Sequence, residues 1–382
     1  MTIELPFIPA LLLILLAAGA GRLLSLKINQ PEIFGELILG MIIGNIIVLA
    51  PAAKGPVSDV AKMGIMLLLF LTGLSLDLER FKELVMPASG VAVGGVILPF
   101  ILGYLVGINF GFTTEVALFM GASLVATSVG ISASILQESG KLQTRTGTLI
   151  IDSAVADDVI GIVMMTVLFS LATTGALNLI DISSLVLFSV LFFVLSLTLG
   201  VIAIKEISQR IPIEKENLLL GGLIILLSFA LITEEIGLAA VIGAFVAGLV
   251  TGQTRFVGPL TESVSLVGRG FFIPIFFVST GMKFDLNEFT SIGFFAVVLV
   301  TLAIAGKIMG CGLGAKLFGF NNRESLAAGV AMVPRAEVAL IIARFGLGNG
   351  VLDPDVFSTI LVMVIVTTLL TPPVLWRILK ET

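Results

Sequence analysis

Long apolar segments separated by short polar loops dominate the hydrophobic pattern of the chain. A membrane-spanning helix needs about 20 mostly apolar residues, and the sequence offers thirteen such stretches. The pattern predicts an all-α integral membrane protein, with one transmembrane domain over residues 1–382. The expected spans are roughly 6–26, 33–50, 58–76, 87–107, 113–136, 144–173, 182–204, 217–234, 237–253, 265–281, 290–318, 324–345 and 353–378.

Basic residues fall mostly on one side of these spans. With the N-terminus outside, fifteen of the 21 Lys and Arg residues lie in inside loops or the C-terminal tail, and only Lys54, Lys62 and Lys283 lie outside. Cytoplasmic loops of membrane proteins retain an excess of Lys and Arg. The asymmetry predicts a multi-pass protein of the plasma membrane, with its N-terminus outside and its C-terminus in the cytoplasm.

The two halves of the sequence resemble each other at a constant offset of 208 residues. The segment at 72–81 matches the segment at 280–289 in five of ten positions. The same offset pairs Gly35 with Gly243, Gly40 with Gly248, Gly44 with Gly252, and 121–127 with 329–335. It carries spans 1–6 onto spans 8–13, and a shift of seven spans reverses the direction of crossing. The sequence therefore predicts an inverted-topology repeat, as in many secondary transporters, and convergent use of Gly and Leu is the alternative.

Spans 113–136 and 324–345 carry the signals of interrupted helices. Pro334 removes a backbone donor and disfavours helix around it. Thr127 and Ser128, at the equivalent depth of the first repeat, favour non-helical backbone and offer oxygens. In inverted-repeat transporters the binding site lies near the midplane, where paired helices are broken and free carbonyls can ligate cations. We therefore expect the site at these two positions.

Composition restricts the classes of function. Hydrophobic residues make up 57% of the chain and charged residues 12%, against roughly 45–50% and 25% in soluble proteins. This composition excludes a soluble enzyme, a nucleic-acid-binding protein and a disordered chain. The single cysteine, Cys311, excludes an internal disulfide, and the absence of histidine removes the commonest transition-metal ligand. Charges inside spans thus become the functional candidates.

Two adjacent aspartates lie near the middle of span 144–173. Asp157 and Asp158 diverge by about 100° on a helix, so that one can meet a basic partner while the other faces a cavity. Lys307, inside span 290–318, is the expected partner and a candidate proton carrier. The alternatives are a purely stabilising ion pair, which explains only one of the two acids, and a lysine that reaches the membrane interface.

Other charges at or near the spans have less specific interpretations. Arg335 and Glu337 lie beside the break in the twelfth span, where we favour a structural role over direct ion binding. Asp152 is expected to be a solvated residue of a cytoplasmic funnel, with direct coordination as the alternative. Glu32 and Glu36 flank the start of the second span, and we expect them at the membrane interface.

The available oxygen ligands favour a hard monovalent cation. A carboxylate that holds either Na⁺ or H⁺ exchanges the two by competition, and alternating access then carries one or the other across the membrane. A Na⁺-coupled solute symporter is an alternative, although the sequence does not show the additional polar groups of a substrate cavity. An intramembrane aspartyl protease needs two converging acids, whereas Asp157 and Asp158 diverge and no Gly-x-Gly-Asp segment is present.

The sequence resembles the monovalent cation:proton antiporter-2 family over essentially its whole length. The residues that carry the resemblance are Ala126-Thr-Ser-Val-Gly-Ile131, Ala156-Asp-Asp-Val159, Lys307 and Val333-Pro-Arg-Ala-Glu-Val338. The resemblance is strongest to the NapA-like Na⁺/H⁺ exchangers and extends to the membrane part of the Kef K⁺ efflux systems. It implies an NhaA/NapA-like fold with two crossed broken helices.

The resemblance also implies roles for individual residues. Asp158 would be the principal ion- and proton-binding carboxylate, and Asp157 would form an ion pair with Lys307 that breaks when the cation binds. Thr127 would add a ligand, so that Na⁺ is held by Asp158, Asp157 and Thr127. The two aspartates and the lysine are similar to the electrogenic subgroup, which exchanges two protons per Na⁺. Kef-like K⁺/H⁺ exchange is the alternative, but Kef-like proteins usually have Gln at the first aspartate, where this chain has Asp157, and this departure favours Na⁺.

The family architecture adds expectations about assembly. It implies a homodimer with an elevator-like moving core at about 87–173 and 290–379, and a dimerisation scaffold at about 1–86 and 182–289. Kef-like proteins append a cytoplasmic nucleotide-binding domain, and we expect no such regulatory domain here. The expected partners are Na⁺, with Li⁺ or K⁺ as further candidates, H⁺ and the lipid bilayer. No cofactor and no nucleic acid are expected.

Overall fold

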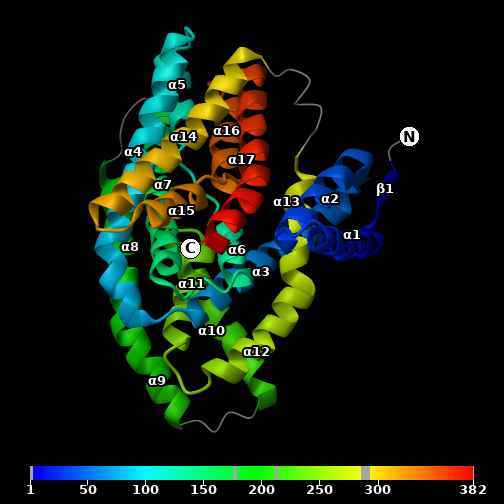
Figure 1. The fold of residues 1–382 in the computed structure, drawn as a ribbon, viewed down its shortest axis with the longest axis vertical. Coiled ribbons are helices and arrows are strands. Elements are labelled where there is room, and N and C mark those ends of the chain that lie inside the picture. Colours follow the sequence, from blue (N-terminus) through cyan, green and yellow to red (C-terminus); the bar gives the residue numbers. More distant parts are fainter. Residues whose placement is uncertain (1–2, 175–178, 211–214, 285–292, 382) are drawn as a thin grey trace. The chain divides into compact units, whose positions relative to one another are not determined.

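The fold, taken from a computed structural model, is almost entirely helical over the residues that the structure describes, which are 3–174, 179–210, 215–284 and 293–381 (Figure 1). A short parallel pair, β1 (Ile3–Leu5) with β2 (Ile47–Leu49), departs from the expected all-α composition. Eight described helices are long and apolar enough to cross a membrane. The chain is therefore a multi-pass membrane protein.

The contacts divide the chain into two units, each built from two separate stretches of sequence. Unit 1 comprises Met1–Lys82 and Leu187–Asp285, and unit 2 comprises Glu83–Val186 and Leu286–Thr382. Two helices run across these boundaries, α4 (Leu78–Asn109) and α8 (Leu179–Leu195). Each unit thus joins an early and a late part of the chain.

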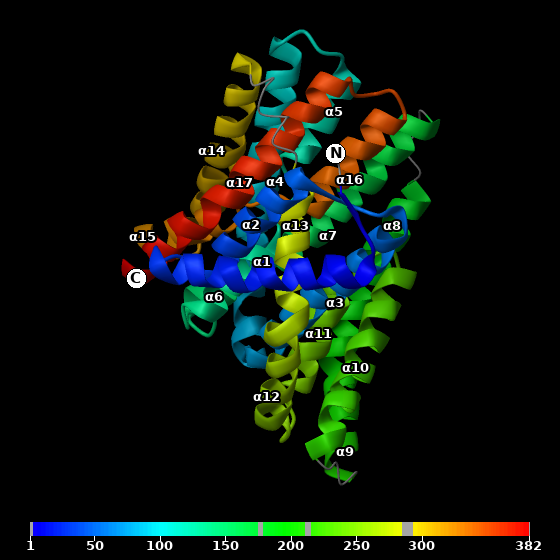
Figure 2. The same ribbon diagram turned by 90° about the vertical axis from the view of Figure 1, so that its right-hand side faces the viewer.

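Glycine residues at the helix contacts of unit 1 let its helices pack closely against one another. Its other elements are α1 (Phe7–Lys27), α2 (Glu32–Ile46), α3 (Pro51–Ser75), the π-helical turn η1 (Ser196–Gly200), α9 (Val201–Arg210), α10 (Lys215–Glu235), α11 (Ala240–Thr251), α12 (Val257–Val267), the π-helical turn η2 (Gly268–Phe272) and α13 (Ile273–Met282). Figure 2 shows α1 running across α13, which it contacts. A Cβ atom at Gly40 on α2 would meet the carbonyl oxygen of Val278. A Cβ atom at Gly248 on α11 would meet the carbonyl oxygen of Phe70. Small residues at such points let helix backbones approach closely.

A charged cluster in unit 1 joins α1 to α2. Arg22 Nε lies 2.8 Å from Glu36 Oε1 and 3.3 Å from Glu32 Oε2, and Arg22 Nη2 donates to the carbonyl of Arg269 at 2.9 Å. Glu36 is only 2% exposed, so packing within unit 1 covers its side chain, and its position at the membrane interface stays a prediction. Close packing of α1 on α2 buries this carboxylate, and Arg22 supplies the compensating charge.

Unit 2 contains the helices that carry the candidate site residues. They are α4, α5 (Thr114–Ser123), α6 (Val129–Glu138), α7 (Arg145–Thr174), α14 (Phe294–Leu317), α15 (Asn322–Ala331), α16 (Glu337–Gly348) and α17 (Pro354–Glu381). Helix α14 packs on α15 and α17, and α7 packs on α5, α6 and α15. The short helices α5, α6, α15 and α16 have ten to twelve residues each, which is too few to cross a bilayer alone.

Candidate functional site

Two helix interruptions form the centre of unit 2. Helix α5 ends at Ser123 and α6 begins at Val129, whereas α15 ends at Ala331 and α16 begins at Glu337. The second break contains Pro334, which cannot donate a helical hydrogen bond. The interruptions leave peptide carbonyls at the ends of α5 and α15 without helical partners.

The two interruptions contact each other through hydrogen bonds. The backbone N–H of Ser128 donates to the Pro334 carbonyl at 2.8 Å. Thr127 Oγ1 donates to the Met332 carbonyl at 3.3 Å, and the Ser132 hydroxyl donates to the carbonyl of Ala331. These bonds satisfy buried backbone groups that a continuous helix would otherwise satisfy. They also place the Thr127 oxygen where residues 124–128 meet residues 332–336, a contact region that we call the crossing.

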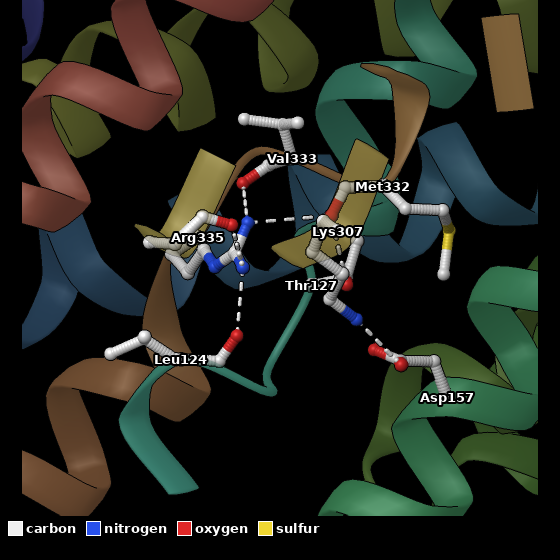
Figure 3. Close-up of polar contacts among 8 residues, drawn as sticks. Leu124, Thr127, Asp157, Lys307, Met332, Val333 and Arg335 are labelled. Carbon is white, nitrogen blue, oxygen red and sulfur yellow. Dashed lines mark hydrogen bonds and ion pairs between the residues drawn. The ribbon is translucent and has the colours of Figure 1, made fainter. Parts of the chain in front are cut away.

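Arg335 occupies the crossing and is fully buried. Its Nη2 atom donates to the carbonyls of Leu124 at 2.7 Å and Ala303 at 3.1 Å, and Nη1 donates to the carbonyls of Met332 and Val333 (Figure 3). These acceptors include backbone at the C-terminal ends of both α5 and α15, where helix dipoles favour positive charge. The guanidinium therefore joins the two broken helices to α14.

We expect Arg335→Lys to lower the melting temperature of the detergent-solubilised protein by several degrees. Lysine keeps the charge but lacks the planar fork that reaches carbonyls on three segments, and each lost charged hydrogen bond costs about 1.5–3 kcal/mol. The matched control is Arg344→Lys on α16, where the side chain is exposed. Equal melting temperatures for the two variants would contradict the proposed bracing role.

A buried ion pair lies beside the crossing. Lys307 Nζ on α14 lies 2.7 Å from Asp157 Oδ1 on α7, and both side chains have zero exposed area (Figure 3). The second carboxylate oxygen, Asp157 Oδ2, has no hydrogen-bond partner among the described residues. The pair is therefore electrically balanced but retains one free acceptor.

The remaining predicted site residues differ in burial. Asp158 follows Asp157 on α7 and is half-buried. Asp152, expected to be a solvated funnel residue, is only 4% exposed, because α5, α6 and α15 pack against α7. Glu337 begins α16, and its side chain lies outside the described part of the chain.

The structure brings Thr127, Asp157, Lys307 and Arg335 into one region of unit 2 (Figure 3). Sequence reasoning did not identify Thr368 of α17, whose hydroxyl donates to the Arg335 carbonyl at 2.5 Å. It also did not identify the carbonyl acceptors of Arg335, because backbone groups leave no signal in the sequence beyond the break itself.

The oxygen atoms around the crossing suit a singly charged ion. No cluster of three or more Asp, Glu, His or Cys side chains that could hold a metal ion occurs within the described residues. A divalent cation prefers six or more oxygen ligands with several carboxylates. The Asp158 carboxylate, the Thr127 hydroxyl and the backbone carbonyls of the interruptions are oxygen groups of the kind that hold a monovalent cation or a proton.

Comparisons with known proteins agree with this chemistry. The family described as sodium/hydrogen exchanger, transmembrane, matches residues 11–381. The chain is 36% identical over 374 residues to the Na(+)/H(+)-K(+) antiporter GerN of Bacillus cereus, covering 97% of this chain and 96% of that protein. It is 31% identical over 378 residues to a Na(+)/H(+) antiporter of Enterococcus hirae, covering 98% of both proteins.

A solved structure shares the fold. The sodium proton antiporter MjNhaP1 from Methanocaldococcus jannaschii, at pH 8, superposes with a TM-score of 0.72 and covers 97% of this chain and 98% of that chain. The sequence identity is 19%, so this likeness establishes the architecture alone.

Proposed function

The chain belongs to the sodium/hydrogen exchanger family, and we propose that it exchanges Na⁺ for H⁺ across the plasma membrane electrogenically and by alternating access. It is a secondary transporter, not an enzyme. The observation that carries the proposal is the buried Lys307–Asp157 pair next to the half-buried Asp158, on helices that pack around two crossed interruptions. The exchange needs only the transported ions and no cofactor.

Competition at Asp158 gives the exchange. A carboxylate binds either a proton or Na⁺, and occupancy by one removes the charge that attracts the other. Thr127 supports this assignment, because its hydroxyl donates to Met332 and keeps lone pairs for a cation. Asp157 would join the ligands once its bond to Lys307 opens, since Asp157 Oδ2 already has no partner among the described residues.

Lys307 supplies the second proton in this proposal. When Na⁺ binds Asp157 and Asp158, Lys307 loses its counter-charge, and an unpaired buried ammonium is costly. Release of its proton relieves that cost. Two protons per Na⁺ then move one net charge, which is worth about 2.3 kcal/mol per 100 mV of membrane potential.

We propose thirteen spans with an inverted-topology repeat. Helix boundaries support the offset of 208 residues. It carries Phe7–Lys27 onto Lys215–Glu235, and Thr114–Ser123 onto Asn322–Ala331. It also carries the interruption at 124–128 onto the interruption at 332–336.

Close glycine contacts supply independent support for the repeat. In each of these contacts, a glycine lies so close to a backbone carbonyl of another helix that a Cβ atom would not fit. The contacts related by the offset are Gly40 to Val278 with Gly248 to Phe70, and Gly121 to Phe100 with Gly329 to Ile308. These paired contacts favour the repeat over convergent use of Gly and Leu.

The two units suit a division of labour. We propose that residues about 87–173 and 290–379 form an elevator-like transport core, and that about 1–86 and 182–289 form the scaffold of a homodimer. The candidate ion ligands Thr127, Asp157 and Asp158 all belong to unit 2, which supports a single moving body. The basic residues of the loops support an outside N-terminus and a cytoplasmic C-terminus.

Wild-type proteoliposomes test the function directly. A dye inside the vesicles reports the internal pH. We expect a Na⁺ gradient to drive proton movement across the membrane, and an imposed membrane potential to change the rate of that movement. A K⁺ gradient of the same size should drive proton movement at a rate at least ten-fold lower. Equal rates for K⁺ would favour K⁺/H⁺ exchange, for which the similarity to GerN is the specific observation. A rate that does not respond to voltage would contradict the electrogenic stoichiometry.

A further inference from the structure

Two polar side chains near the start of α7 have no assigned role. Thr148 is 1% exposed and Asp152 is 4% exposed. Thr148 Oγ1 and both carboxylate oxygens of Asp152 have no hydrogen-bond partner among the described residues. The neighbouring Ser153 differs, because its hydroxyl donates to the Leu149 carbonyl at 2.6 Å. Buried polar atoms are nearly always paired, so three unpaired oxygens call for an explanation.

The helix places these three oxygens together. Residues four apart on an α-helix are rotated by about 40° and separated by about 6 Å along the axis. Thr148 and Asp152 therefore share one face of α7. Asp157 lies about 7.5 Å further along and about 140° around the helix from Asp152. The Thr148–Asp152 group is thus separate from the Lys307–Asp157 pair.

Charge balance defines what this group can bind. An isolated buried carboxylate is strongly unfavourable unless a positive charge accompanies it. No basic side chain in the described part of the chain forms an ion pair with Asp152. The single carboxylate balances one positive charge, so a divalent cation would leave the group with a net positive charge, and the hydroxyl adds a neutral oxygen ligand.

Asp152 lies along α7 between the start of the helix and the main site. Asp152 lies seven residues after Arg145, about 10 Å from the first residue of α7 and before Asp157. That end of α7 is held in place, because Thr146 Oγ1 donates to Glu324 Oε1 at 3.3 Å and the Arg145 guanidinium lies 4.1 Å from the centre of the Phe320 ring. The group therefore lies between a fixed helix end and the main site.

We propose that Thr148 and Asp152 form a second binding site for a monovalent cation, through which the cation passes between the N-terminal end of α7 and Asp158. The identity of the cation as Na⁺ rests on the proposed function. The existence of the site rests on the unpaired buried oxygens alone.

Transport kinetics in proteoliposomes test the proposal. We expect Asp152→Asn to raise the apparent KM for Na⁺ at least five-fold and to leave the maximal rate within two-fold. Thr148→Val, which removes the hydroxyl and keeps the shape, should shift KM in the same direction by a smaller factor. Ser153→Ala is the matched control and should leave both values unchanged. An unchanged KM in Asp152→Asn would overturn the proposal.

Direct binding separates the second site from the first. Purified Asp158→Asn should retain weak, saturable binding of ²²Na⁺, and the double variant Asp158→Asn with Asp152→Asn should lose it. Absence of binding in Asp158→Asn, or equal binding in both proteins, would overturn the proposal. If Asp152→Asn is not monodisperse on size exclusion, Thr148→Val replaces it in the same comparison. Failure of Na⁺-driven flux in the wild type would instead reject the proposed function.

Discussion

We expect Asp158→Asn to reduce Na⁺-driven proton movement in proteoliposomes by at least 100-fold, to the level of liposomes without protein. Asparagine keeps the size of the side chain but neither binds a proton near neutral pH nor carries the charge that attracts Na⁺. In the proposed mechanism the neighbouring Asp157 becomes a ligand only when its 2.7 Å contact with Lys307 opens, so it does not replace the charge lost at Asp158. The measurement is the initial rate of internal pH change after a Na⁺ pulse.

The control for this experiment is Asp355→Asn, because Asp355 is exposed in the first turn of α17. That variant should keep a rate close to wild type. If Asp158→Asn retained more than a tenth of the wild-type rate, competition at Asp158 would not be the mechanism. The carboxylate that exchanges Na⁺ and H⁺ would then have to be sought elsewhere.

The second large effect concerns the stability of the buried ion pair. Removing one partner of such a pair costs about 3–5 kcal/mol, whereas replacing both partners by apolar residues is often neutral. We expect Lys307→Met and Asp157→Leu each to lower the melting temperature in detergent by about 5 °C or more. The double variant should melt at a higher temperature than either single variant.

A control on the same helix makes the result specific. Lys316 lies near the end of α14 and is exposed, so Lys316→Met should change the melting temperature by about 1 °C or less. Additive losses in the double variant would mean that Lys307 and Asp157 do not stabilise each other. The 2.7 Å contact would then contribute little to stability.

The sequence predicts much of the fold because its signals are strong and local. Long apolar stretches define spans by length alone, and Pro334 marks one interruption by removing a backbone donor. The other interruption begins at Leu124 and Val125, which are ordinary helix residues. In the sequence, this interruption is indicated only by the repeat offset of 208 residues, which places it opposite Pro334, and by the adjacent Thr127. Tertiary contacts, such as the hydrogen bond from Ser128 to Pro334, determine where that helix ends.

The candidate site was harder to predict in detail. Helical geometry shows that Asp157 and Asp158 diverge, but it does not decide which of them meets Lys307, and that choice came from the family resemblance. The burial of Asp152 and Glu36 could not be predicted, because it depends on which helices pack over them. The π-helical turns η1 and η2 likewise had no signal in the sequence.

The division of each unit between two distant stretches has a consequence for biosynthesis. Asp157 leaves the ribosome 150 residues before Lys307, the residue that pairs with it. At about 5–20 residues per second, the aspartate waits roughly 8–30 s for its partner. During that interval an unpaired carboxylate in a membrane span costs about 2.5–3.5 kcal/mol on the insertion scale. The nascent chain must therefore hold α7 near water until α14 has been made.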